Sequence, residues 1–382
     1  MNRNHSKHIV RFITAFTLSD ASQDRSYFLI FEWADGGSLN DLYANNPSPA
    51  LTSELVKRIV SQLLGLAEAL KATHDAGIRH GDIKPDNILH FKPADKQDII
   101  GTLKIGDWGL AKYHPDSTVL RVKRGQPTDT RFGTTAYEPP EVELAELKLL
   151  SRQYDIWSIG CVILEMIIWL VYGCIGVKNF RLDVQGEYRE SVPFYTIEKQ
   201  EELEDGGTIH RAKLQKPVED WLDRLQESPV CDPNTALGEL LRVVRRQLLI
   251  VELPPALGPV RVKDWDIEDD PSKGTPRFLV REPTSRHAAV GDSRGIMTTR
   301  RYRATSAGLV AALGRESGIM DPDLDNKDFW LKPGAKVSKA PRLMQDRSGH
   351  FPKIEEGVRP DTNLLLKKPF PIVRFSLNMF SH

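Results

Sequence analysis

The chain is predicted to be an α+β protein, with a small β region followed by a mainly helical body. The first apolar segments, residues 8–13 and 27–31, are short runs of β-branched and aromatic side chains, a composition typical of strands. After residue 38 the apolar residues recur mostly every three or four positions, which is the spacing of one helix face. Strands first and helices afterwards are the layout of the α+β class. With 382 residues and 40% hydrophobic content, the chain can bury a large core.

Polar turns are predicted on either side of the second strand. Residues 19–25 are a polar run that separates the two strands, and residues 35–38 are a glycine-rich turn. Ser38 at the end of this turn can cap a short helix that begins at Leu39.

The rest of the body is predicted to consist of helices around a buried central helix at residues 157–171. A long helix begins at Thr52 or Ser53 and ends near His74 and Gly77. Two further helices and a last one at residues 302–313 follow. The predicted apolar faces of the flanking helices are Leu55, Ile59, Leu63, Leu66 and Leu70; Val218, Trp221, Leu222 and Leu225; and Leu237, Leu240, Leu241, Val244 and Leu248.

One segment has the composition of a membrane span. Residues 161–177 are almost wholly apolar, but Glu165 interrupts them and Gly173 and Gly176 end them. The length is marginal for crossing a bilayer, and a carboxylate inside it is costly there. A buried helix of a soluble domain is therefore the prediction, and no membrane partner is expected.

The C-terminal part of the chain has little periodicity. Residues 254–300 are rich in proline, glycine, aspartate and serine, and are expected to form an insertion or a partly disordered loop. After residue 315 the chain carries many prolines and lysines, which indicates a solvated extension, with a docking segment as the alternative.

Charge and cysteine content limit the classes of partner. Lysine plus arginine and aspartate plus glutamate both number 52, so no overall excess of positive charge favours nucleic acid or an anionic membrane. Cys161, Cys174 and Cys231 are far apart and show no metal-ligand spacing, which favours reduced thiols in an intracellular protein. Residues 1–5 are polar and contain no apolar core of a secretion signal.

Two short segments carry the residues of a phosphoryl-transfer site. Residues 80–89 read HGDIKPDNIL, and residues 104–109 read KIGDWG. Phosphoryl transfer needs a carboxylate for the attacking hydroxyl, a cation on the transferred group and oxygen ligands for magnesium. Asp82 would accept the hydroxyl proton and Lys84 would contact the γ-phosphate. Asn87 and Asp107 would hold Mg²⁺ beside ATP, and the flanking apolar residues are expected to form short strands.

These segments resemble the catalytic loop and the metal-binding loop of protein kinases, with residues 107–109 (DWG) where that family has DFG. Residues 133–141 (GTTAYEPPE) resemble the end of a kinase activation segment, and residues 154–161 (YDIWSIGC) resemble the start of its buried central helix. Four matches in the family's order make chance improbable. The resemblance implies a kinase-like fold with a partial N-lobe at 1–34, a C-lobe at 35–315 with an insertion at 254–300, and an extension at 316–382.

The resemblance also assigns roles outside the two loops. Glu32 and Ala34 would form the hinge that binds adenine through its backbone. Asp155 would hold the catalytic loop by its N–H groups, and Glu141 would pair with Arg303. Lys84, two residues after Asp82, together with Thr134 is similar to the serine/threonine-specific pattern. The implied activity is therefore transfer of phosphate from ATP to a serine or threonine of a protein substrate.

The pattern departs from the family in the N-lobe. No glycine-rich loop, lysine-bearing strand or glutamate-bearing helix can be placed before His8. A sheet without these strands would expose an edge and an apolar face. Either the sequence belongs to a longer kinase or a partner covers the incomplete N-lobe. A catalytically impaired, kinase-shaped scaffold is the alternative from another functional class.

A second departure is Gly81, where many kinases have an arginine. It removes the cation that receives a phosphorylated activation segment, so phosphorylation at Ser117, Thr118, Thr128 or Thr130 is not required. The HGD triplet is also similar to small-molecule kinases of the aminoglycoside type. Lys84 and residues 133–141 favour a protein substrate over that alternative.

Overall fold

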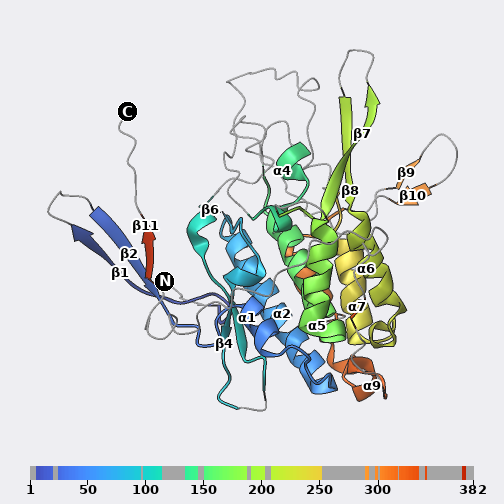
Figure 1. The fold of residues 1–382 in the computed structure, drawn as a ribbon, viewed down its shortest axis with the longest axis horizontal. Coiled ribbons are helices and arrows are strands. Elements are labelled where there is room, and N and C mark those ends of the chain that lie inside the picture. Colours follow the sequence, from blue (N-terminus) through green and yellow to red (C-terminus); the bar gives the residue numbers. More distant parts are fainter. Residues whose placement is uncertain are drawn as a thin grey trace, which may run out of the picture.

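A small sheet lies to one side of a body of helices (Figure 1). The structure, a computed structural model, describes residues 6–19, 25–95, 98–113, 134–144, 150–186, 191–202, 208–251, 302–316, 318–334 and 340–341, with short strands at 289–291, 297–299 and 372–375. Most of the predicted insertion at 254–300 and most of the predicted extension lie outside these residues. The described part contains both strands and helices, which confirms the α+β prediction.

The strands form small antiparallel sheets whose order is β1-β2-β11, β3-β6, β4-β5, β7-β8 and β9-β10. They are β1 Phe12–Ser19, β2 Arg25–Phe31, β3 Ile78–Arg79, β4 Ile88–Phe91, β5 Thr102–Ile105, β6 Lys112–Tyr113, β7 Tyr195–Glu202, β8 Thr208–Leu214, β9 Ala289–Gly291, β10 Met297–Thr299 and β11 Ile372–Phe375.

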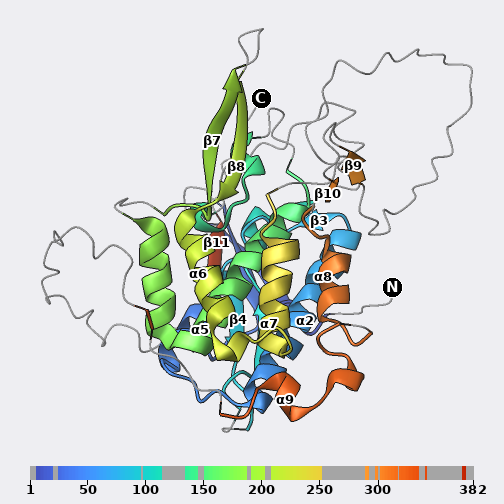
Figure 2. The same cartoon turned by 90° about the vertical axis from the view of Figure 1, so that its right-hand side faces the viewer.

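The helices form the body that Figure 2 shows from the side. They are α1 Leu39–Asn45, α2 Ser53–Asp75, α4 Glu141–Leu144, α5 Gln153–Gln185, α6 Lys216–Glu227, α7 Ala236–Val243, α8 Ser306–Leu313 and α9 Lys327–Trp330. A π-helical turn, Val244–Leu248, extends α7, and 3-10 turns occur at Pro85–Asn87, Trp108–Leu110, Thr135–Tyr137, Pro229–Cys231 and Pro322–Leu324.

The helix starts follow the predicted capping residues. The Ser38 hydroxyl accepts a hydrogen bond from the Asp41 N–H, and the Asp41 carboxylate accepts one from the Ser38 N–H, which is a capping box at the start of α1. The Thr52 hydroxyl accepts from the Leu55 N–H at the start of α2. The last predicted helix begins later than expected, because Thr305 caps α8 at Ser306.

The first predicted strand was misplaced. Instead of residues 8–13, β1 covers Phe12–Ser19, and residue 19 therefore belongs to the strand rather than to the turn. Residues 8–10 lie along β5, because the Ile105 N–H donates to the His8 carbonyl at 2.8 Å and the Val10 N–H donates to the Ile105 carbonyl at 2.9 Å. The apolar run at 8–13 thus serves two elements, which a local pattern cannot separate.

The N-terminal sheet has a third strand from the C-terminal end of the chain. β11 pairs with β2 on the edge opposite β1, with Val373 opposite Leu29. The strand β1 exposes apolar side chains to water: Phe12, Ile13 and Leu18 are each about half exposed. The edge of β2 is therefore bonded within the chain, while an apolar surface of the sheet stays open.

The central helix α5 is longer than predicted and is bent. It begins at Gln153 and continues to Gln185, but Gly173 has φ 72° and ψ −171°, which breaks it into two segments. A Cβ at Gly173 would lie 2.4 Å from the Pro47 carbonyl, which accepts a hydrogen bond from the Cys174 N–H at 2.8 Å. Only glycine fits this close approach with a positive φ.

The apolar character of α5 comes from burial in protein. Among the described residues, α5 is the one helix long and apolar enough to cross a membrane by length and composition, and 83% of its most apolar stretch is buried. Trp157 and Trp169 on α5 are fully buried, and Trp169 lies against Tyr43 of α1 with ring centroids 5.3 Å apart. This packing is that of the buried core helix predicted from the sequence.

A β-hairpin interrupts the helical body, contrary to the prediction that the pattern after α5 stays helical. β7 and β8 project from the body as an antiparallel pair (Figures 1 and 2). At the base of the hairpin, Tyr195 is buried and packs edge-on against Trp157. Apart from this base, the strands are rich in charged residues, so they lack the alternation of apolar and polar residues that predicts strands.

Residues 318–334 pack on the helical body. Ile319, Phe329 and Trp330 are buried and join the main apolar core, and the Trp330 indole N–H donates to the Asp325 carboxylate at 2.7 Å. This part of the predicted extension is therefore anchored on the core at three apolar side chains, while residues 322–328 between them are exposed. The division of the chain at residues 34 and 315 stays a prediction.

A buried ion pair holds α4 to the segment before α8. The Arg303 guanidinium donates to both oxygens of Glu141, at 2.6 and 3.0 Å, and also to the carbonyls of Gln153 and Ile250. Both residues are buried. The pairing of Glu141 with Arg303 that the resemblance implied is confirmed.

Substitution of Arg303 by methionine is expected to lower the free energy of unfolding by about 3–5 kcal/mol, because it leaves the Glu141 carboxylate buried without its cation. Urea denaturation of the full chain measures this change. The matched control is Lys71→Met, which removes an exposed pair with Asp75 and should cost less than about 1 kcal/mol. Equal effects of the two substitutions would contradict the role given to Arg303.

Candidate active site

The carboxylate of Asp82 is the centre of a group of polar side chains that lie on two segments. Its Oδ1 accepts hydrogen bonds from the Thr134 N–H at 3.1 Å and the Thr134 hydroxyl at 3.0 Å. Its Oδ2 accepts from the Asn87 side-chain amide at 2.9 Å and lies 2.8 Å from the Lys84 ammonium. The structure therefore brings together three residues of the predicted site, Asp82, Lys84 and Asn87.

Lys84 and Asn87 make further contacts that fix them around Asp82. The Lys84 ammonium donates to the Thr134 hydroxyl at 2.6 Å, and the Asn87 amide donates a second bond to the Asp82 carbonyl at 2.8 Å. Since the Asn87 nitrogen faces Asp82, its side-chain oxygen is the atom left for another ligand. Thr134 thus joins the end of the activation-like segment to the loop at 80–89.

A second carboxylate, Asp155 at the start of α5, holds the loop from behind. It is fully buried and accepts hydrogen bonds from the backbone N–H groups of His80 and Gly81, both at 2.8 Å, and from the His74 ring at 2.9 Å. The anchoring role implied for Asp155 is confirmed. His74 on α2 is a partner that the sequence reasoning missed, because it is 81 positions from Asp155 along the chain.

The surroundings of Asp155 keep it ionised. Burial alone raises the pKa of its carboxyl, but the hydrogen bond and positive charge of His74, and the backbone N–H of Gly81, outweigh burial. The pKa of Asp155 therefore lies below its ordinary value of 3.8.

Gly106 joins the two predicted loops. His80 Nδ1 accepts from the Asp82 N–H at 3.3 Å, so its Nε2 carries the hydrogen that is donated to the Gly106 carbonyl at 2.9 Å. The Gly106 N–H in turn donates to the Asn87 carbonyl at 2.9 Å. The residue before Asp107 is therefore bonded to both ends of the segment that carries Asp82.

Asp107 is exposed and lies in an unusual backbone conformation. Its φ is 50° and its ψ is 77°, and it is the one non-glycine residue with positive φ among the described residues. Its Oδ1 accepts from the Gly109 N–H at 3.2 Å. Such left-handed residues are uncommon and often occur at functional sites. Within the described residues, Asp107 makes no side-chain contact with Asp82, Lys84 or Asn87.

Comparison with known proteins identifies the family. Residues 1–188 match the family model described as the protein kinase domain. This region belongs to the protein kinase family. The chain is 30% identical over 164 residues to a serine/threonine-protein kinase stk11 homolog of Dictyostelium discoideum, which covers 43% of this chain and 25% of that protein. It is 36% identical over 149 residues to the serine/threonine-protein kinase cds1 of Schizosaccharomyces pombe, with 38% and 28% covered.

The chain thus spans about a quarter of the length of these two kinases. A solved structure of the yeast RNA Pol II CTD kinase CTDK-1 complex is 26% identical and covers 44% of this chain and 46% of that chain, with a TM-score of 0.33 that is too low to carry an argument. The family resemblance predicted from the sequence motifs is confirmed by the match over residues 1–188.

The predicted hinge of the kinase domain follows β2. The Glu32 carboxylate accepts from the Lys104 ammonium at 2.6 Å and from the Arg11 N–H at 2.8 Å, so this side chain is engaged within the protein. The Gly36 N–H donates to the His90 carbonyl at 3.0 Å, which ties the hinge to β4. Among the described residues no group bonds the Ala34 N–H, which leaves it available to a ligand.

A buried arginine, Arg79, lies two residues before Gly81, while position 81 itself carries no cation. Gly81 has φ 83°, and a Cβ on it would lie 3.2 Å from the Leu110 carbonyl and 3.8 Å from Arg79 Nε. The buried Arg79 guanidinium donates to the Leu150 carbonyl at 3.0 Å and lies over the Tyr154 ring. Burial lowers its pKa. Residues 117, 118, 128 and 130 lie outside the described part of the chain.

The side-chain oxygens of Asn87 and Asp107 are of the chemical kind that suits a magnesium ion. Asn87 offers its side-chain oxygen and Asp107 an exposed carboxylate, and hard oxygen donors are what Mg²⁺ prefers. Among the described residues no group of three or more histidine, cysteine, aspartate or glutamate side chains could hold a metal. Magnesium in phosphoryl-transfer enzymes is bound by one or two protein groups together with water and the phosphates.

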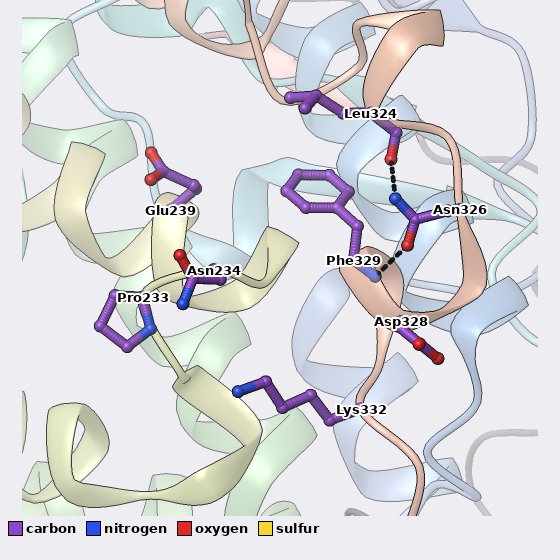
Figure 3. Close-up of a pocket in the computed structure, with 8 residues that line it drawn as sticks. All are labelled: Pro233, Asn234, Glu239, Leu324, Asn326, Asp328, Phe329 and Lys332. Atoms are coloured by element: carbon purple, nitrogen blue, oxygen red, sulfur yellow. Dashed lines mark hydrogen bonds between the residues drawn. The ribbon is translucent and has the colours of Figure 1, made fainter.

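A separate hollow of about 460 Å³ lies beside α9 and does not belong to this site (Figure 3). Three of its polar side chains have partners within the protein: Glu239 pairs with Arg242, Lys332 pairs with Asp232, and Asn326 caps α9. Its other lining residues are Pro233, Asn234, Leu324, Asp328 and Phe329. None of the residues predicted for catalysis lines this hollow.

Substitution of Asp155 by asparagine is expected to lower the free energy of unfolding at neutral pH by about 3 kcal/mol, because it removes a paired buried charge. The folded-state pKa is depressed, so the stabilisation is complete above the ordinary value of 3.8 and is lost as the pH falls through the lower folded value. Urea denaturation from neutral pH to about pH 3 tests this. Wild type should lose stability towards acid more steeply than the variant, and parallel profiles would contradict the assignment.

Proposed function

We propose that this chain is a serine/threonine protein kinase that transfers the γ-phosphate of ATP to a hydroxyl of a protein substrate. The observation that carries the proposal is the direct contact of Asp82 with Lys84, Asn87 and Thr134. A cation and an amide are thus each held within hydrogen-bond distance of one carboxylate, on the loop that precedes Asp107. Positioning and electrostatic stabilisation supply almost all of the catalysis of this reaction.

In the proposed reaction Asp82 acts on the substrate hydroxyl. The hydroxyl oxygen forms a bond to the γ-phosphorus, the bond to the oxygen bridging the β- and γ-phosphates breaks, and ADP leaves. Asp82 Oδ2 accepts the hydroxyl proton, and Lys84 holds the γ-phosphate oxygens by its positive charge. Asn87 and Asp107 would hold Mg²⁺, which neutralises phosphate charge when bound. Glu32 and Ala34 would offer backbone groups to the adenine.

Thr134 supports a protein substrate with a serine or threonine acceptor. Its hydroxyl accepts from Lys84 and donates to Asp82, so the end of the activation-like segment borders the catalytic carboxylate directly. A small-molecule phosphotransferase would not need a peptide-docking segment at this position. The relatives named above are themselves serine/threonine kinases.

The rival proposal is a kinase-shaped scaffold without transfer activity. It is motivated by the exposed apolar face of β1, where Phe12, Ile13 and Leu18 are each about half exposed and could bind a partner. Both proposals are compatible with a partner that covers the exposed side chains of β1 and β2. Both also include an intracellular location, which the free thiols of Cys161, Cys174 and Cys231 support.

Substitution of Asp82 by asparagine should lower phosphate transfer to a generic basic protein by about 10²–10⁴-fold, because the amide cannot accept the hydroxyl proton. Radiolabel transfer from ATP by the full chain measures this, with an aminoglycoside as the comparison acceptor. Asp75→Asn, an exposed aspartate at the end of α2, is the control and should transfer at the wild-type rate. Labelling of the aminoglycoside alone would overturn the protein-kinase proposal.

Substitution of Asp107 by asparagine should abolish magnesium-dependent ATP binding and leave the fold intact, since this exposed side chain makes only a local bond to Gly109. ATP with Mg²⁺ at 100 times its Kd should stabilise the wild-type chain by about 2.7 kcal/mol, seen as a rise in Tm. The same ATP without Mg²⁺ is the control. An unchanged Tm in wild type and variant alike would favour the scaffold.

A further inference from the structure

Glu165, the carboxylate inside the apolar stretch of α5, is part of a hydrogen-bonded chain that the proposed reaction does not use. The Glu165 side chain is fully buried. Arg181 donates to it twice, from Nε to Oε1 at 2.8 Å and from Nη2 to Oε2 at 2.6 Å. The Tyr137 hydroxyl lies 3.1 and 3.2 Å from the two oxygens. Both oxygens of this buried charge are therefore satisfied.

The kink at Gly173 makes this pairing feasible. Glu165 and Arg181 are 16 positions apart on α5, and in a straight helix their Cα atoms would be roughly 24 Å apart at 1.5 Å per residue. The loop after α1 fixes the bend, because the Trp169 indole donates to the Asn46 carbonyl at 2.9 Å and the Cys174 N–H donates to the Pro47 carbonyl at 2.8 Å. The second segment of α5 can then bring Arg181 back to Glu165.

Arg181 also reaches the catalytic loop. Its Nη2 donates to the Asn40 side-chain oxygen at 2.8 Å, and the Asn40 amide donates to the Asp86 carboxylate at 2.8 Å. Asp86 immediately precedes Asn87, whose amide bonds Asp82. Through Asn40 on α1, the guanidinium is therefore linked to the segment that carries the catalytic residues.

At its other end this series of hydrogen bonds reaches the segment that contains Thr134, which contacts Asp82. Tyr137 is in the 3-10 turn Thr135–Tyr137, directly after Thr134, whose N–H and hydroxyl bond Asp82. The Ser158 hydroxyl donates to the Tyr137 carbonyl at 2.8 Å, which fixes this turn on α5. Arg181 thus connects both segments that meet at Asp82.

The charge of Glu165 helps to keep Arg181 and Tyr137 protonated. Burial alone lowers the pKa of Arg181, but the hydrogen bonds and charge of Glu165 outweigh burial and raise it. Burial, and then the Glu165 charge, raise the pKa of the Tyr137 hydroxyl well above its ordinary value. Tyr137 and Arg181 therefore remain donors throughout the pH range of ordinary assays.

We propose that Arg181 is a positioning residue for phosphoryl transfer, joining the turn at Tyr137 to the catalytic loop at Asp86 through Glu165 and Asn40. The inference rests on the proposed function. It assigns to Arg181 the alignment of the two segments that meet at Asp82, the catalytic loop and the turn at Tyr137. The Arg181 guanidinium does not touch the reacting groups; it sets the distance between the substrate-docking turn and Asp82. A small misplacement of such groups costs rate strongly, because the reaction depends on orientation.

Asn40→Ala is the sharpest test, since it cuts the link to Asp86 and leaves the buried pair of Glu165 and Arg181 intact. The matched control is Asn46→Ala at the other end of α1, where the side chain bonds only the Leu42 carbonyl. In the full chain, Asn40→Ala should lower kcat for a basic protein substrate by roughly tenfold, with the KM for ATP unchanged. The denaturation midpoint should equal that of the control.

A double-mutant cycle with Asp86→Ala tests the route. Each single substitution breaks the same bond, so the double variant should be no slower than either single one. Additive losses would overturn the route through Asp86. Equal kcat in Asn40→Ala and Asn46→Ala, or a loss of kcat matched by a lower denaturation midpoint, would overturn the positioning role while the proposed function stands. No transfer by the wild-type chain would overturn the proposed function and this inference with it.

Discussion

The loop at residues 80–89 depends on one buried carboxylate, that of Asp155. Burial of an isolated charge is too costly for a fold to tolerate, so its donors must stay in place: the N–H groups of His80 and Gly81 and the ring of His74. These donors come from α2 and from the loop, and the acceptor comes from α5. A single satisfied charge therefore sets the position of the loop on the helical core, and Asp82 follows from it.

The same device recurs along the segment from α4 to the end of α5. Glu141 is held by Arg303 and Glu165 by Arg181, each through two charge-assisted hydrogen bonds. Each carboxylate fixes a different feature to the core. Glu141 holds the end of the activation-like segment, Glu165 holds the turn at Tyr137, and Asp155 holds the loop at 80–89. The apolar packing around Trp157 and Trp169 supplies most of the stability, whereas these pairs supply the orientation.

Local patterns predicted the elements with strong periodicity or clear caps. The helices after Ser38 and Thr52 and the amphipathic face at Val218 lie where expected, because caps and apolar spacing act within a few residues. The β7–β8 hairpin was missed, since most of its residues are charged and only its base packs on the core. The strand at 8–13 was misplaced, because the backbone at residues 8–10 bonds β5 instead.

By itself the sequence determined that Asp82, Lys84 and Asn87 lie close together, because they are near neighbours on one short loop. It also determined the class of fold, through the order of strand-like and helix-like segments. Only the tertiary structure decided which distant donor each buried carboxylate receives and that β11 joins β2. Such pairings depend on how helices bend and pack over many residues, and no local spacing encodes that geometry.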